Sequence, residues 1–324
     1  MSDAFFAPRK AAAILDPAIA TRNAGDEVIA DAARRWIRKA LPDHFLTTLP
    51  THDKMGIRSH RLIRQAEYAI VGGSNILSST LFTDRGWRVG LQDLLFVDKL
   101  ILLAAGWRNY EKKPTPVTGM MLRRLLDKNA IHSVRDTHTK DMLASVGIEN
   151  VVVTACVTMW QLTPDHIAEI PKKKGSSVVT TFSMRKPSPH DSHLIDILLK
   201  LYDRVYIWPQ GFDDMAYVSQ LSNGRAALLA PTLEAYDELL EADPSLDYLG
   251  IRLHAGIRAL QKGVRSYIVS IDNRAAEISK DTNLPIVSRG ASEEELRELV
   301  SMDYAPELQL PQNEIDIWMD QFKK

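Results

Sequence analysis

The sequence predicts an α/β fold in which two doubly wound domains of parallel sheet face a cleft. Short apolar runs alternate with amphipathic segments along the chain, which is typical of parallel sheets with helices on both faces. The polar segment PKKKGSS at 171–177 interrupts this alternation, and we interpret it as the linker. With 324 residues the chain is long enough for two domains. We therefore expect an N-terminal domain over 1–170 and a C-terminal domain over 171–324.

The elements of the N-terminal domain follow from apolar runs and helical spacing. Asp26 is a suitable N-cap for a helix over 27–41, whose apolar residues recur every three or four positions. Gly147 closes a helix over 139–146, and a further helix is expected over 120–126. The expected strands are 11–15, 45–49, 68–71, 100–105, 131–134 and 150–155.

The C-terminal domain repeats the alternation. Ser292 and Glu295 fit a capping box for a helix that runs through residue 300. A last helix over 312–323 carries an apolar stripe that needs a surface, and the N-terminal domain is a candidate for that surface. The other expected helices are 193–202, 213–221, 233–240 and 255–262, and the expected strands are 177–183, 204–208, 226–229, 247–251 and 267–271.

Composition narrows the classes of function. The 40 basic and 41 acidic residues give a net charge of -1, so no global basic field favours nucleic acid. Cys156 is the single cysteine, which excludes an intrachain disulfide and fits a cytoplasmic location. We expect no integral membrane segment and no signal peptide, since neither pattern is present, although peripheral association with the inner face of the membrane is compatible with this composition. The nine histidines lack metal-ligand spacing, so we predict no protein-built metal site.

The strongest functional pattern lies in the stretch 247–274. Ligands of open parallel sheets bind beyond the carboxyl ends of the strands. Arg252 and His254 follow one expected strand of this stretch, and Asp272 and Arg274 follow the next. The start of the helix after His254 adds backbone N–H groups that favour anions. The stretch therefore predicts an anion site with a titratable group, although a structural histidine is an equal alternative.

Two further arginines follow expected strands. Arg135 could clamp a phosphate or a carboxylate with its planar fork, or it could pair with Asp136 and fix the loop. Arg185 lies beyond the first strand of the C-terminal domain, where it could face the cleft or solvent.

Two glycine-containing loops are weaker candidates. Asn23 and Asp26 lie in the loop TRNAGDE before the first helix, where a ligand-binding loop and a simple turn with an N-cap are both open. Gly72 and Gly73 follow the strand at 68–71, and a structural turn is the simpler reading of that pair. Neither loop is a dinucleotide fingerprint.

Together these segments resemble the polysaccharide pyruvyl transferase family. TRNAGDEVI resembles the entry of that family to its first helix, and VGGSNIL resembles its glycine loop. HSVRDTHTKDMLASVGI resembles its R-D-x-x-T segment, and LGIRLHAGIRALQKGV followed by SIDNR is similar to its R-x-H segment and the next strand. The chain departs from the usual Asp-Pro after the strand at 150–155, where it has Cys156 and Val157.

The resemblance implies two Rossmann-like domains of the GT-B kind and a transferase that moves a pyruvyl group from phosphoenolpyruvate to a sugar as a ketal. It implies a surface polysaccharide, an exopolysaccharide or a precursor as acceptor, which can be lipid-linked, and no cofactor beyond phosphoenolpyruvate as co-substrate. With this donor, we expect Arg185, Arg252, Arg135, Asp272 and Arg274 on the donor side and His254 with Arg252 in catalysis. The expected acceptor residues on the N-terminal domain are Asn23, Asp26, Gly72 and Gly73.

Two other functions remain compatible with the sequence. One is a GT-B glycosyltransferase with a nucleotide-sugar donor, and the other is a non-catalytic glycan- or phosphate-binding protein on the same fold. The sequence does not distinguish oligomeric states.

Overall fold

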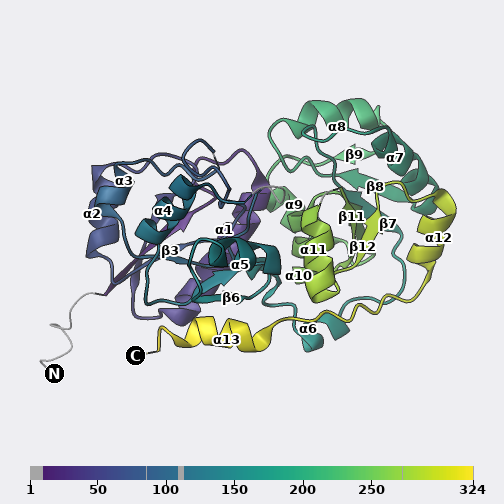
Figure 1. Ribbon diagram of the computed structural model, residues 1–324. Helices are drawn as coiled ribbons and strands as arrows, with labels where there is room; N and C mark the ends of the chain where they lie inside the picture. The colour runs from purple at the N-terminus through teal and green to yellow at the C-terminus, as the bar shows by residue number, and fades with distance from the viewer. Residues whose placement is uncertain (1–9, 85, 109–112, 272, 324) are drawn as a thin grey trace, which may run out of the picture. The chain divides into compact units, whose positions relative to one another are not determined.

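The chain forms two compact units in the computed structural model (Figure 1). The model describes residues 10–84, 86–108, 113–271 and 273–323, without the side chains of 273 and 274. Unit 1 comprises Met1–Thr21, Ile29–Val157 and Pro311–Lys324, and unit 2 comprises Arg22–Val28 and Thr158–Leu310.

Unit 1 is built on parallel strands. Four of them pair in the order β2-β1-β3-β4, and β5 pairs with β6. A parallel bridge between Ala105 and Val134 joins the chain after β4 to β5. The strand order changes direction between β1 and β3, as it does at the switch point of doubly wound folds. The strands are β1 (Ala11–Asp16), β2 (Phe45–Pro50), β3 (Tyr68–Val71), β4 (Leu100–Leu102), β5 (His132–Val134) and β6 (Val151–Val153).

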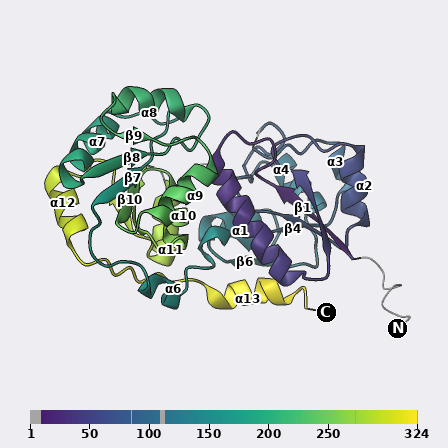
Figure 2. The ribbon, with the colours of Figure 1, turned by 180° about the vertical axis from the view of Figure 1, so that it is seen from behind.

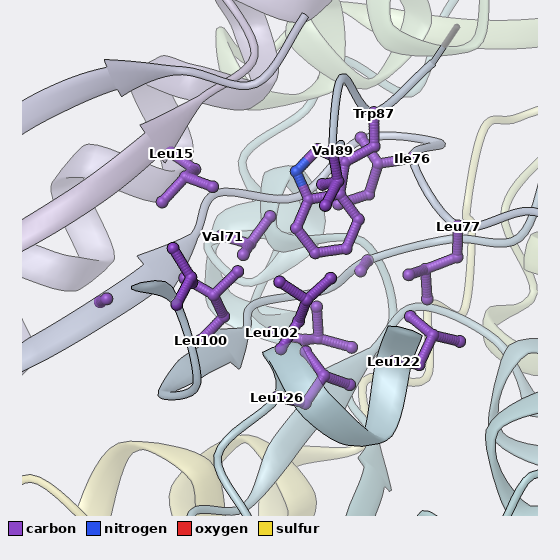
Figure 3. Packing of buried hydrophobic residues seen from close by; sticks show 14 of the residues in the cluster. Leu15, Val71, Ile76, Leu77, Trp87, Val89, Leu100, Leu102, Leu122 and Leu126 are labelled. Carbon is purple, nitrogen blue, oxygen red and sulfur yellow. The ribbon is translucent and has the colours of Figure 1, made fainter. Parts of the chain in front are cut away.

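The helices of unit 1 enclose an apolar core. Figure 3 shows Trp87 and Val89 packed near Ile76, with Leu100 and Leu102 of β4 beneath them. The last helix, α13, belongs to this unit, and Trp318 donates its indole N–H to the carbonyl of Leu102 at 3.0 Å. The helices are α1 (Ala24–Ala40, whose first turn belongs to unit 2), α2 (Ile57–Gln65), α3 (Asp93–Phe96), α4 (Pro116–Leu125), α5 (Thr137–Ala144) and α13 (Gln312–Asp320).

Unit 2 has one six-stranded parallel sheet in the order β12-β11-β10-β7-β8-β9. The first three strands in sequence extend to one side and the last three to the other, which places the switch point between β7 and β10. Figures 1 and 2 show α7 and α8 next to each other, whereas α10 packs along β10 and β11. The strands are β7 (Ser177–Thr180), β8 (Arg204–Ile207), β9 (Ala227–Leu228), β10 (Leu246–Gly250), β11 (Arg265–Ser270) and β12 (Ile286–Ser288).

Two helices of unit 2 show the start and stop signals that the sequence predicts. Ser292 and Glu295 form both hydrogen bonds of the capping box of α12, and Gly263 has the positive φ of +75° that ends α10. The helices are α6 (Pro164–Ala168), α7 (Pro189–Leu201), α8 (Asp214–Ser222), α9 (Leu233–Ala242), α10 (Leu253–Gln261), α11 (Asn273–Thr282) and α12 (Glu293–Ser301), and a 3-10 turn covers Val157–Met159.

The structure corrects the expected division of the chain at 170/171. The change of unit falls at Val157–Thr158, and 171–177 is part of unit 2. The amide of Gly175 donates to Asp247 at 3.3 Å, and the amide of Tyr304 donates to the carbonyl of Lys172 at 2.8 Å. The segment 171–177 is polar, as linkers are, but it is part of unit 2 because its backbone is hydrogen-bonded to that unit.

Several elements are absent from the sequence prediction. The helices α2, α3, α6 and α11 and the strand β12 were not expected. Residue 273, expected in a loop, begins α11. The helix α2 lacks a side-chain N-cap because Gly56 precedes it, so the usual start signal is missing. No helix in the described ranges is both long and apolar enough to cross a bilayer.

A buried histidine in unit 1 makes the stability of the chain depend on pH. Nε2 of His132 lies 2.9 Å from the carbonyl of Asp127 and donates to it, and Nδ1 accepts the amide of Leu102 at 3.2 Å. Burial lowers the pKa of His132 from 6.5 to about 4, against the opposing effect of the Asp127 carbonyl. A proton on Nδ1 would also replace the hydrogen bond from the Leu102 amide with a repulsive contact between two N–H groups.

We therefore expect the free energy of unfolding to fall by up to about 3 kcal/mol as pH drops from 6.5 to about 4. In this window the unfolded chain binds a proton that the folded chain does not. Urea unfolding of the protein and of a His132→Gln variant across this range measures the effect. Equal pH slopes for the two proteins would contradict it, because glutamine does not titrate.

Candidate functional site

The candidate site lies at the switch point of unit 2, where the loops after β7, β8 and β10 meet. Arg252 follows β10 and is the N-cap of α10. Its amide donates to Oγ1 of Thr181 after β7 at 3.1 Å, and the hydroxyl of Tyr248 donates to its carbonyl at 2.8 Å. The backbone of Arg252 is thus fixed on both sides of the switch point.

The guanidinium of Arg252 forms an ion pair with Asp214, the first residue of α8. The carboxylate of Asp214 also accepts the amides of Gly211 at 2.8 Å and Met184 at 2.9 Å. Asp214 is 1% exposed, whereas 15% of the side chain of Arg252 remains exposed. One buried carboxylate therefore holds the three loops together and leaves the cation at the surface of the site.

The helix α10 packs tightly enough to fix the direction of its N-terminus. A Cβ at Gly256 would lie 2.5 Å from Ile268 Cγ1 and 2.8 Å from Tyr248 Cε1, so only glycine permits this approach. His254 is the second residue of α10 and is half-buried. The side chain of Arg252 does not cap the first turn. The helix begins at Leu253, two residues before the expected start at 255, so His254 lies within its first turn and not ahead of it.

The loop around Asn23 belongs to the same unit and lies against the loop after β8. Nε2 of Gln210 donates to Oδ1 of Asn23 at 2.8 Å, and the amide of Ala24 donates to the carbonyl of Gln210 at 2.9 Å. Asn23 and Asp26 also hydrogen-bond to each other at 3.3 Å. A Cβ at Gly25 would lie 2.5 Å from Gln210 Nε2. This corrects the expected placement of Asn23 and Asp26 on the N-terminal domain.

Two buried polar atoms near this junction have no hydrogen-bond partner among the described residues. They are Nε of Arg252 and Oε1 of Gln210. Buried polar groups are almost always satisfied in folded proteins, so exceptions mark places where a ligand or water is needed. Nε of Arg252 is a hydrogen-bond donor and Oε1 of Gln210 is an acceptor, and both belong to loops that Asp214 connects. The two atoms therefore suit a polar ligand.

The remaining predicted donor residues are distributed more widely. Arg185 is exposed in the loop after β7. Asp272 and the side chain of Arg274 lie outside the described residues. Another arginine of this edge, Arg289, follows β12 and donates to buried Asp191 at 2.7 Å, which makes it a structural residue of its loop.

Gly72 and Gly73 lie at the switch point of unit 1. Gly73 has a φ of +87°, and a Cβ there would lie 2.9 Å from Ile29 Cγ2. A Cβ at Gly72 would lie 3.2 Å from the carbonyl oxygen of Leu15. Close packing alone thus explains why both positions are glycine. Their backbone nevertheless lies at the carboxyl edge of the sheet.

Arg135 also lies in unit 1, and it forms the loop-fixing pair that was the alternative to ligand binding. Nε of Arg135 donates to Asp136 at 3.0 Å, and Asp136 caps α5 by accepting the amide of Thr139 at 2.7 Å. Burial alone would raise the pKa of Asp136, yet the charge of Arg135 and the hydrogen bonds from Thr139 hold this pKa below its usual value. Arg135 is 4% exposed, so its guanidinium is committed to the protein interior.

Asp214 and Gln210 were the functional residues that sequence reasoning did not select. Their segment, WPQGFDD, leads into the helix that the sequence predicts over 213–221, and Pro209 and Gly211 in it favour a fixed turn. The structure has Asp213 at the N-cap without a capping hydrogen bond, and Asp213 pairs with Arg22 at 3.4 Å instead. The available signal was the pair Asp213 and Asp214 at the start of the helix that follows β8. Within the described part of the chain, no three His, Cys, Asp or Glu side chains gather as metal ligands would.

Two similar solved structures support the fold. The UDP-GlcNAc 2-epimerase of Methanocaldococcus jannaschii is 12% identical, with a TM-score of 0.50, and the match covers 93% of this chain and 95% of that chain. MnaA of S. aureus is 14% identical, with a TM-score of 0.52, and the match covers 90% of this chain and 87% of that chain. At these identities the likeness concerns the fold alone, which is of the GT-B kind with two Rossmann-like domains.

The chain matches a protein-family model but no curated protein. The family model described as polysaccharide pyruvyl transferase matches residues 23–273, which is more than half of the chain and includes Asn23, Arg252 and His254. The chain belongs to the polysaccharide pyruvyl transferase family.

Proposed function

We propose that this protein transfers the pyruvyl group of phosphoenolpyruvate to two hydroxyls of a sugar in a surface polysaccharide, an exopolysaccharide or a precursor. The family is a transferase family, and it supports polysaccharide modification. The observation that carries the donor assignment is Arg252, a cation held at the switch point of unit 2 by buried Asp214.

Phosphoenolpyruvate carries a phosphate and a carboxylate on the same carbon, so its site needs several donors that point to one small region. The guanidinium of Arg252 is anchored by Asp214 through one nitrogen, and its Nε has no partner within the described residues. Arginine binds such anions through a planar fork, and the start of α10 adds backbone N–H groups. Exposed Arg185 in the loop after β7 is the second candidate cation, because β7 and β10 are neighbours.

The reaction needs a group that moves protons. One sugar hydroxyl adds to the central carbon of phosphoenolpyruvate and loses its proton, while the methylene carbon gains a proton and becomes a methyl group. The second hydroxyl then forms the other C–O bond, loses its proton and displaces phosphate, which completes the ketal. We assign the proton transfers to His254, because an imidazole titrates near ~6.5 and lies two residues from Arg252.

The acceptor needs hydrogen-bonding groups of its own. We propose that Asn23 and Asp26 contribute them in unit 2, where Gln210 orients Asn23 and presents an unsatisfied carbonyl oxygen. Gly72 and Gly73 remain candidates in unit 1, because backbone there can approach a sugar closely.

Phosphate release tests this function. We expect phosphate to be released from phosphoenolpyruvate only when a suitable glycan is added from a panel of acceptors, and the product to carry an acid-labile pyruvate ketal. Thermal stabilisation by phosphoenolpyruvate and by UDP-sugars provides a comparison. The epimerase structure noted above contains UDP-GlcNAc and UDP, so strong stabilisation by UDP-sugars alone would favour nucleotide-sugar chemistry and contradict the proposal. Stabilisation by a donor without any turnover would indicate a binding protein.

A further inference from the structure

Unit 1 carries a face on which exposed apolar side chains mix with arginines. The helices α2, α3 and α4 form it, since α3 contacts both of the others, and both ribbon views show the three together (Figures 1 and 2). Leu95 is 73% exposed and Ile57 is 82% exposed. The large exposed apolar residues of this face are Ile57, Leu91, Leu95, Phe96, Val117 and Met120. We call these residues, with the arginines of the same helices, the basic apolar face.

The spacing of these residues places them on the outer sides of the helices. In α4, Val117, Met120 and Arg124 are exposed at helical intervals, while Met121 and Leu125 on the opposite side are buried. In α2, Ile57, Arg61 and Arg64 repeat the same arrangement. Both helices therefore bury one apolar stripe and expose a second stripe that is apolar at one end and cationic at the other.

Within the three helices the exposed charge has one sign. The exposed ionised groups within the three helices are all arginines, namely Arg58, Arg61, Arg64, Arg123 and Arg124. Asp93, the one acidic residue in these helices, is 1% exposed and lies 2.6 Å from Nε2 of His60. Among flanking acids, Asp98 pairs with Arg124 at 3.4 Å and Glu67 pairs with His44 at 3.0 Å.

The exposed residues of α3 are held in place by buried contacts. His60 binds Asp93 and stacks on Phe96 with ring centroids 5.1 Å apart, and Asp93 also accepts the amide of Gly90 at 2.6 Å. Leu95 and Phe96 also line a pocket of about 270 Å³ with Ile63, Arg64, Asp98 and Lys99. A protein that fixes Leu and Phe in solvent beside arginines has the features of an interfacial surface.

We propose that the basic apolar face docks unit 1 on the surface of an anionic lipid bilayer. Apolar side chains would enter the boundary between headgroups and acyl chains, and the arginines would meet the negative headgroups and extend their stems along the apolar layer. The one-sided positive charge favours anionic lipid over neutral lipid, with about fivefold in affinity for each arginine near the surface. The proposal goes beyond pyruvyl transfer and does not depend on it.

Vesicle flotation of the full chain tests the proposal, with phosphatidylcholine vesicles that contain or lack phosphatidylglycerol. We expect binding to the anionic vesicles, weakening with salt, and little binding to phosphatidylcholine alone. A Leu95→Ser, Phe96→Ser variant should bind at least about tenfold more weakly, since each apolar side chain contributes to insertion. Phe45→Ser is the matched control, because Phe45 is 74% exposed in the same unit but lies on β2.

Two results of the flotation experiment would contradict the proposal. Absence of binding to anionic vesicles, or equal loss in the Phe45→Ser control, would remove the assignment of this face. A dimer in solution that Leu95→Ser dissociates, without any vesicle binding, would show that the face contacts protein instead. Urea unfolding of each variant confirms that weaker binding does not reflect a loss of folding. Arg58→Gln, Arg61→Gln, Arg64→Gln should reduce anionic binding while the exposed apolar residues remain, which separates the charge from the insertion.

Discussion

Replacing His254 by alanine is expected to lower turnover with phosphoenolpyruvate about 10²- to 10⁴-fold, because a positioned acid/base group contributes that much to a proton transfer. His254 is half-buried in the first turn of α10, two residues after Arg252. In the proposed mechanism the donor anion binds to Arg252 and the helix start, which the change leaves in place. The loss should therefore fall on kcat, with a smaller change in KM for phosphoenolpyruvate. Initial rates of phosphate release with a productive acceptor measure both constants.

A matched control separates chemistry from folding. His193 is exposed on α7 of the same unit, and His193→Ala should keep normal turnover. His254→Gln retains hydrogen-bonding capacity but cannot carry the proton, so it should resemble alanine in kcat. Near-normal turnover in His254→Ala would eliminate this histidine as the acid/base group, provided that urea unfolding shows a folded protein.

Replacing Arg252 by lysine is expected to raise KM for phosphoenolpyruvate by about tenfold to a hundredfold. Lysine keeps the positive charge opposite Asp214, but it lacks the fork that contacts an anion while one nitrogen stays on the carboxylate. A hydrogen bond to a charged group is worth about 1.5–3 kcal/mol, which corresponds to this range. Steady-state kinetics and thermal stabilisation by phosphoenolpyruvate provide two independent readouts.

Arg289 offers a control with nearly the same environment. Its side chain is 17% exposed against 15% for Arg252, and it pairs with a buried carboxylate, Asp191, at the same edge of the same sheet. It follows the outer strand β12, whereas Arg252 lies at the switch point. Arg289→Lys should therefore affect stability without changing KM. If both variants weaken donor binding equally, the loss reflects the loops in general, and an unchanged KM in Arg252→Lys contradicts the clamp.

Much of the fold is visible in the sequence because its signals are local. The strand Tyr68–Val71 is a continuous apolar run that stops at two glycines, and the structure confirms its bounds. The capping box of Ser292 and Glu295 is formed as expected. The helices α2 and α3 escaped prediction because α2 lacks a capping side chain and α3 has only four residues. The exposed apolar residues of both helices also weaken the alternation of apolar and polar positions by which an amphipathic helix is recognised.

In the candidate site, too, residues that are close in the sequence could be predicted, whereas contacts between distant segments could not. Arg252 and His254 were found because a strand end, a cation and an imidazole lie within eight residues of sequence, 247–254. Asp214 was missed because its partner lies 38 residues away, and Gln210 because it lies 187 residues from Asn23. Residues 22–28 read as part of the N-terminal domain, since they lead into α1, yet their hydrogen bonds go to Gln210 and Phe212 of unit 2.

The sequence by itself determined the α/β class, the order of most strands and helices, and the Arg252–His254 pair, because these depend on periodicity, caps and neighbours in the chain. Tertiary structure alone decided which carboxylate anchors Arg252, which unit holds Asn23, and that Arg135 is committed to Asp136. Hydrogen bonds and ion pairs between distant segments depend on strand order and on the direction of each crossover. That information appears only when the strands pair, and here the order β12-β11-β10-β7-β8-β9 sets Arg252 beside the loop of Asp214.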